Sequence, residues 1–180
     1  MLVRDRPAGA IRPEWADLWY LYRLVRTMKP GVILEFGSGC STIVMASALR
    51  RNRRGRLYSI ETDPRWYRAT LDATSPELRD VVVITLCPLE EITVHDVPAF
   101  RHRDIPTVVP DLLYLDGPAL TPERQVAVDP LDLEDRLRPG FTMVVDGRLE
   151  NAAFLRRHLR RSYSVRFSRL RGNTTFTLLG

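Results

Sequence analysis

The sequence has little cysteine, a single lysine and no long apolar run. Two cysteines are too few for a disulfide framework or a four-ligand structural zinc site. No apolar stretch reaches the roughly 18–20 residues that a membrane-spanning helix needs. The stretch from Met1 to Arg12 scatters arginines where a secretory signal would place apolar residues. We therefore expect a cytoplasmic protein without a membrane partner.

The positive charge comes almost entirely from arginine. Lysine and arginine together number 27 against 22 acidic residues, which gives a net charge of +5, and Lys29 is the only lysine. Such charge can indicate binding to nucleic acid. The densest run, Arg50 to Arg56, falls where a helix is predicted to end, and cations stabilise that end of a helix. We interpret the run as structural, so nucleic acid is not favoured as a partner.

Short apolar runs alternate with helical patterns along the chain. The 180 residues, 44% of them hydrophobic, predict a single domain over 1–180, with a helical segment at 1–30 and a core at 31–180. The strands are expected at 32–36, 56–61, 81–86, 111–116 and 141–146, and a closing hairpin at 162–170 and 174–179. Helices between them predict an α/β, doubly wound, mostly parallel sheet covered on both faces.

Other segments allow less definite expectations. Four prolines predict an irregular, functional loop at 87–110. The helix after the first strand is expected to have Ser41 or Thr42 as its N-cap, and the helix after the second strand Thr62 or Asp63. Aromatic residues at helical spacing in 13–28 fit either the core or a lid over a ligand; they include Trp15, Trp19, Tyr20 and Tyr22.

Acidic residues and glycines follow three of the predicted strands. Glu35 precedes Gly37-Ser38-Gly39, Glu61 ends the second strand, and Asp116 ends the fourth. The carboxyl ends of parallel strands lie at one edge of the sheet, so these residues are expected to converge. The glycines allow a tight turn that leaves helix amides free, and a carboxylate 24 residues after Gly37 can accept ribose hydroxyls. A nucleoside-containing cofactor is the predicted ligand.

Two details distinguish between nucleoside cofactors. A dinucleotide site would have glycine at the sixth position of its G-x-G-x-x-G pattern, where this chain has Thr42. The carboxylate of Glu35 could instead offset an ammonium or sulfonium charge.

Four segments in this order resemble the class I S-adenosylmethionine-dependent methyltransferases. They are VILEFGSGCST, YSIETD, DLLYLDGP and LRPGFTMVVDG. The resemblance covers nearly the whole chain and implies a Rossmann-like, three-layer αβα fold with a seven-stranded sheet closed by a C-terminal β-hairpin. It departs from the family at Ser41, where a third glycine is common.

The resemblance also implies a function and a set of site residues. It implies transfer of a methyl group from S-adenosylmethionine to an oxygen of a small-molecule acceptor by in-line displacement. The alternatives are an RNA or DNA methyltransferase and a non-catalytic nucleotide-binding module. The residues expected to bind the cofactor are Glu35, Gly37, Ser38, Gly39, Ser41, Thr42, Glu61, Thr62, Pro88, Leu89 and Asp116.

The base that removes the acceptor's proton is expected among residues at strand ends and in the predicted loop. Asp116 and His95 are the leading candidates, and His102 is a third. Asp116 and Asp146 also resemble two magnesium ligands of catechol-type O-methyltransferases. The chain lacks the asparagine and lysine of that subfamily, with Gly147 and Ala119 in their places, so a divalent metal such as magnesium is not favoured.

No appended substrate domain is expected, because the methyltransferase-like sheet takes up nearly all 180 residues. The acceptor would then be recognised by the N-terminal helix, by the loop at 87–110 and by the stretch at 119–130. A second subunit in a homodimer is the other source of acceptor contacts.

Overall fold

A computed structural model describes residue 7 and residues 14–118 and 125–180. A seven-stranded sheet forms its centre, in the order β3-β2-β1-β6-β8-β10-β9. Six of these seven strands run in the same direction, and β10 runs opposite to them. The predicted mostly parallel sheet with a closing hairpin is therefore confirmed. Its strands are β1 (Val32–Phe36), β2 (Arg56–Glu61), β3 (Val82–Leu86), β6 (Leu112–Leu115), β8 (Thr142–Asp146), β9 (Tyr163–Ser168) and β10 (Asn173–Leu178).

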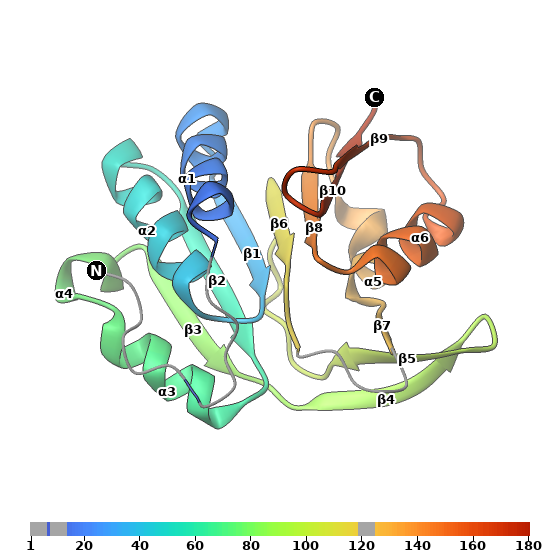
Figure 1. Ribbon diagram of the computed structural model, residues 1–180, viewed down its shortest axis with the longest axis horizontal. Helices are drawn as coiled ribbons and strands as arrows, with labels where there is room; N and C mark the ends of the chain where they lie inside the picture. Colours follow the sequence, from blue (N-terminus) through green and yellow to red (C-terminus); the bar gives the residue numbers. More distant parts are fainter. Residues whose placement is uncertain (1–6, 8–13, 119–124) are drawn as a thin grey trace.

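Helices cover both faces of the sheet (Figure 1). One layer contains α1 (Trp15–Met28), α2 (Cys40–Asn52), α3 (Pro64–Ala73) and α4 (Pro76–Arg79), and the other contains α5 (Asp129–Leu133), the 3₁₀ turn η1 (Glu134–Arg136) and α6 (Leu149–His158). The central strands are apolar at nearly every position because successive side chains point to opposite faces. Ile33 and Leu112 pack on the α1–α2 side, while Leu34 and Leu113 pack on the α5–α6 side.

The largest error of the sequence prediction concerns the segment at 87–110, which was expected to be irregular. It contains the antiparallel strands β4 (Leu89–Val94) and β5 (Val97–His102), which with β7 (Val126–Ala127) form a second sheet. His95 and Asp96 make the connecting turn with φ of 50° and 61°, values that are uncommon for residues other than glycine. Pro98 lies near the start of β5, where proline is tolerated.

The predicted N-cap of α2 was wrong, whereas two other helix predictions were right. The N-cap of α2 is Gly39, not Ser41 or Thr42, and the side chain of Thr42 instead accepts the Gly39 N–H at 2.9 Å. Asp63 caps α3 as predicted. The arginine run does end a helix, with Arg50 and Arg51 in the last turn of α2.

The aromatic residues of α1 divide between core and surface, since Tyr20 and Tyr22 are partly buried and pack against the core, whereas the tryptophans do not. Trp15 and Trp19 are 73% and 60% exposed, while the buried face consists of Leu18, Leu21 and Val25. Residue 13, the predicted start of this helix, lies outside the described residues, as do residues 119–124 of a predicted acceptor-binding stretch.

Candidate functional site

The ends of β1 and β6 approach each other through two glycines. Gly37 has φ of +95°, and a Cβ there would lie 2.5 Å from the backbone nitrogen of Gly117. A Cβ on Gly117 would in turn lie 2.4 Å from the Cα of Gly37. No side chain fits between these backbones, so glycine is required on both sides. This contact brings the predicted cofactor turn directly beside Asp116.

Glu61 is buried at the end of β2 and organises the neighbouring loops. One carboxylate oxygen accepts the N–H and the hydroxyl of Ser38 at 2.7 and 2.8 Å. The other accepts the N–H groups of Thr62 and Asp63 at 2.7 and 2.9 Å. Charge-assisted bonds of this kind hold a carboxylate firmly in place. Glu61 therefore joins the glycine turn to the loop that leads into α3.

Glu35 is fully buried behind the glycine turn. Its two carboxylate oxygens accept the hydroxyls of Ser41 and Thr42, each at 2.6 Å. Burial raises its pKa to about 7, although hydrogen bonds from Ser41, Ser59 and Thr42 oppose that rise. Glu35 thus braces the first turn of α2 from within, and its oxygens are already occupied by these hydroxyls.

Pro88 and Leu89 lie where β3 leads into β4, beside Glu61. The Cys87 N–H donates to the backbone carbonyl of Glu61 at 2.8 Å, which fixes this connection at the same edge of the sheet. Pro88 is exposed and Leu89 is partly buried. The structure therefore places both at the edge of the sheet that also carries the glycine turn.

Asp116 and Asp146 follow adjacent strands, since Leu115 pairs with Val145. Asp116 is exposed to solvent, yet the surrounding protein raises its pKa to about 6 by desolvation, with the nearby charge of Asp146 as the next cause. The hydroxyl of buried Tyr114 donates to Asp146 at 2.5 Å. A pair of carboxylates with raised pKa values thus lies at the open edge of the sheet.

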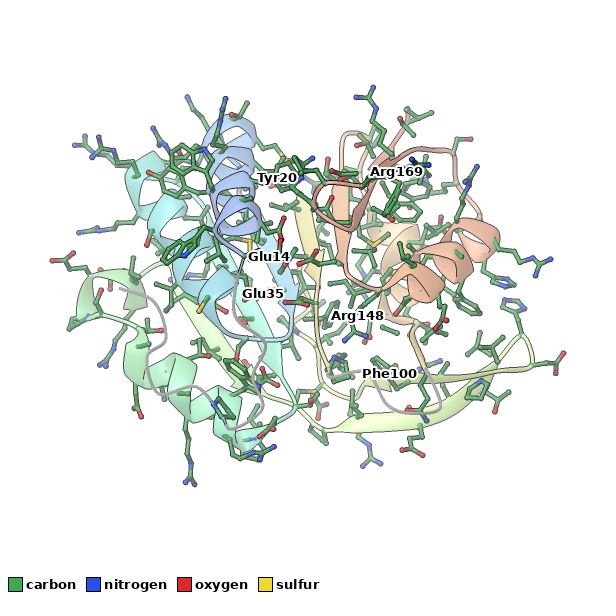
Figure 2. All side chains as sticks on the ribbon, in the orientation of Figure 1. Glu14, Tyr20, Glu35, Phe100, Arg148 and Arg169 are labelled. Atoms are coloured by element: carbon green, nitrogen blue, oxygen red, sulfur yellow. The ribbon has the colours of Figure 1, made fainter. Side chains whose placement is uncertain are left out.

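The sequence analysis missed Arg148 and the acidic first turn of α1. Arg148 is 5% exposed and donates from Nη2 to the backbone carbonyl of Asp116 at 3.0 Å. Burial lowers its pKa, while Asp116 and Asp146 oppose that shift. From α1, Asp17 raises the pKa of Asp116, and Glu14 raises that of Asp146. Figure 2 shows Glu14, Glu35 and Arg148 in the central part of the molecule.

Arg148 could have been found from sequence because it comes two residues after a predicted strand, which is the same signal that identified Asp116. The acidic residues of α1 carried no such signal, since only the packing of α1 beside α2 and the sheet brings them near.

The two histidines of the predicted loop have different surroundings. His95 lies in the β4–β5 turn, with its ring centroid 4.0 Å from that of His158, and Figure 1 shows this turn far from the end of β1. His102 is buried at the end of β5, and its Nδ1 lies 3.1 Å from Asp129. The structure brings Asp116 together with the glycine turn and Glu61, but does not bring His95 to that group.

Asp116 and Asp146 are not part of a larger cluster of metal-ligating side chains among the described residues. Within 14–118 and 125–180, no group of three or more His, Cys, Asp or Glu side chains could hold an ion. Tyr114 already donates to the carboxylate of Asp146.

In the same part of the chain, no helix is long and apolar enough to cross a membrane.

Comparisons with known proteins agree with this geometry. A family model described as a methyltransferase domain matches residues 34–147, more than half of the chain. No protein with a curated description matches the sequence.

Among solved structures, the Streptomyces achromogenes O-methyltransferase TomG, in complex with SAM and involved in tomaymycin synthesis, has 18% identity and a TM-score of 0.63 over 96% of this chain and 83% of that one. A Bacillus cereus O-methyltransferase in complex with SAH has 15% identity and a TM-score of 0.61, over 97% and 84%. The SAH-bound Podospora anserina methyltransferase PaMTH1 has 14% identity and a TM-score of 0.64, over 94% and 80%.

At these identities the structures show a shared fold, while the family match covers all the strand ends described above. The chain belongs to the methyltransferase-domain family, with the fold of the class I S-adenosylmethionine-dependent methyltransferases.

Proposed function

We propose that this protein transfers a methyl group from S-adenosylmethionine to an oxygen atom of a small molecule. The observation that carries the proposal is the convergence of the glycine turn, Glu61 and Asp116 at one edge of the sheet. Structural similarity to O-methyltransferases supports the choice of oxygen.

The charges at this edge suit a cationic cofactor. Carboxylates at positions 17, 61 and 146 all raise the pKa of Asp116, which shows that the region carries excess negative charge. The sulfonium and ammonium groups of S-adenosylmethionine would offset that charge. We propose that Glu61 holds the ribose by exchanging its bond from the Ser38 hydroxyl for bonds from the ribose hydroxyls. The turn from Gly37 to Gly39 would lie along the methionine part, and Pro88 and Leu89 would border the adenine.

When bound, the cofactor would supply an electrophilic methyl group. The protein's contribution is to orient the acceptor and exclude water, because displacement at a methyl carbon requires an aligned approach. Asp116 would take the proton from the acceptor hydroxyl. Its pKa of about 6 makes it a stronger base than an ordinary aspartate while leaving it ionised at neutral pH.

Calorimetry with S-adenosylhomocysteine tests the cofactor assignment. We expect wild-type protein to bind it and Glu61→Ala to lose at least about tenfold in affinity, since both the ribose contact and the loop contacts disappear. Glu77→Ala, at an exposed position on α4, serves as the matched control and should bind like wild type. Absence of binding by folded wild-type protein, or unchanged binding by Glu61→Ala, would contradict the proposal.

A further inference from the structure

Arg148, beside the proposed base Asp116, has guanidinium N–H groups that do not donate to any described residue. Although it is only 5% exposed, its guanidinium donates to the described part of the chain through Nη2, which bonds to the carbonyl oxygen of Asp116. Among the described residues, neither Nε nor Nη1 has a hydrogen-bond partner. Two of its three guanidinium nitrogens are therefore desolvated without compensation from these residues.

The carboxylates nearby do not pair with Arg148. None of the ion pairs between described residues joins it to Asp116 or Asp146, although both carboxylates interact with its charge through space. Asp146 instead accepts the hydroxyl of Tyr114. The guanidinium is held beside the acidic pair through a backbone carbonyl, and its buried Nε and Nη1 remain without a hydrogen-bond partner among the described residues.

An unpaired buried guanidinium is costly, so this arrangement calls for a partner. The group that matches arginine best is a carboxylate, which can accept two parallel N–H bonds from the planar guanidinium. A monoanion also fits the local charge better than a doubly charged phosphate. Arg148 is the cation that acts on both Asp116 and Asp146, and those two acids would repel a second negative charge.

We infer that Arg148 binds a carboxylate group of the methyl acceptor, so that the acceptor is a hydroxy acid whose carboxylate lies close to the hydroxyl that is methylated. The inference rests on the proposed function and specifies its substrate class. Anchoring the carboxylate on Arg148 would place the neighbouring hydroxyl beside Asp116, because the guanidinium contacts the backbone of that same residue. The hydroxyl oxygen would form its bond to the methyl carbon, whose bond to the cofactor sulfur breaks, while the hydroxyl proton passes to the Asp116 carboxylate.

Binding of acid and amide pairs to the protein saturated with S-adenosylhomocysteine tests this inference by calorimetry. The probes are 2-hydroxybenzoate and 2-hydroxybutanoate, each compared with its neutral primary amide. We expect at least one acid to bind wild type tenfold or more tighter than its amide. In Arg148→Gln that preference should disappear, and Arg148→Lys should retain part of it because the charge remains.

The controls separate this inference from the cofactor assignment. Arg157→Gln, an exposed position on α6, should keep the wild-type preference for the acid. Arg148→Gln should bind S-adenosylhomocysteine within about threefold of wild type, whereas failure of wild type to bind it would defeat the proposed function itself.

The inference is overturned if no acid binds wild type more tightly than its amide, or if the preference survives in Arg148→Gln. Should Arg148→Gln fail to fold, as judged by circular dichroism, the wild-type comparison and Arg148→Lys still decide the question.

Discussion

The two halves of the sheet edge differ in how their polar groups are satisfied. At the ends of β1 and β2, Glu35 and Glu61 are buried and their oxygens accept hydrogen bonds from neighbouring loops and helices. At the ends of β6 and β8, Asp116 remains exposed and Arg148 has two nitrogens without a partner in the described chain. The first half is complete by itself, and the second has groups left over.

In the function proposed above, this difference would separate two tasks, holding the cofactor and contacting the acceptor. A turn that holds a fixed cofactor benefits from being rigid before the ligand arrives, since less entropy is lost on binding. Groups that contact a reacting molecule must have hydrogen-bond donors or acceptors that no other residue uses. Carboxylates with raised pKa values are typical of functional sites. We therefore expect substitutions in the first half to affect stability and cofactor binding, and those in the second half to affect turnover.

The largest effect is expected from Asp116→Asn, which removes the proposed base. Methyl transfer should fall about 10²- to 10⁴-fold, while affinity for S-adenosylhomocysteine stays within a few fold. In wild type, activity should rise as the pH increases through about 6, because the base form of Asp116 predominates above its pKa. Initial rates between pH 5 and pH 8 measure this. An identical pH profile in the variant would assign the proton transfer to another group.

Gly37→Ala tests the rigid half. Its Cβ would lie 2.5 Å from the Gly117 nitrogen, and the residue has φ of +95°, so we expect a loss of about 3 kcal/mol in the free energy of unfolding. Gly140→Ala is the matched control, because Gly140 has φ of +86° and a Cβ added there would meet nothing within 4 Å. Strain alone should cost it about 1 kcal/mol. Equal losses in urea denaturation would show that the close approach of β1 and β6 contributes nothing.

Glu35→Gln should change the pH dependence of stability. The pKa of Glu35 rises from 4.5 to about 7 on folding, so the folded state resists its ionisation. The contribution of protonated Glu35 to the free energy of unfolding is fully present below about pH 4.5, and it is lost as the pH rises through about 7. The variant should remove that decline and gain on the order of 3 kcal/mol over wild type at pH 8. Denaturation at pH 5 and pH 8 measures the difference, and a parallel decline in both proteins would rule out Glu35 as its source.

The smallest effect is expected from His95→Ala. His95 was a candidate base in the sequence, but it lies in the β4–β5 turn and stacks on His158. Methyl transfer should change less than about twofold, as measured by initial rates at saturating cofactor. If His95→Ala lost about as much methyl-transfer activity as Asp116→Asn, His95 would be a catalytic residue, and the site would include the β4–β5 turn.

The sequence allowed the position of several acids and glycines at one edge of the sheet to be predicted, while their roles in cofactor binding stay a prediction. Apolar strands buried on both faces, each ending in an acid or a glycine turn, identified Glu35, Gly37, Glu61 and Asp116. Local patterns of this kind are informative because strand ends in a parallel sheet share one edge. The β4–β5 hairpin was missed because β4 has no buried residue, Pro98 lies within β5, and the turn uses His95 and Asp96 instead of glycine.

What the sequence determined by itself was the order of the seven strands of the central sheet along the chain and the acids at their ends. The tertiary structure decided which of those groups remain available. In the sequence, Glu35, Glu61 and Asp116 look alike, because each is an acid at the end of a predicted strand. In the structure, Glu35 and Glu61 are buried and their oxygens accept hydrogen bonds, whereas Asp116 is exposed. The free nitrogens of Arg148 depend on which neighbours lie within hydrogen-bond distance. Such availability is a property of three-dimensional packing, because hydrogen bonds and desolvation depend on distances between residues that are remote along the chain.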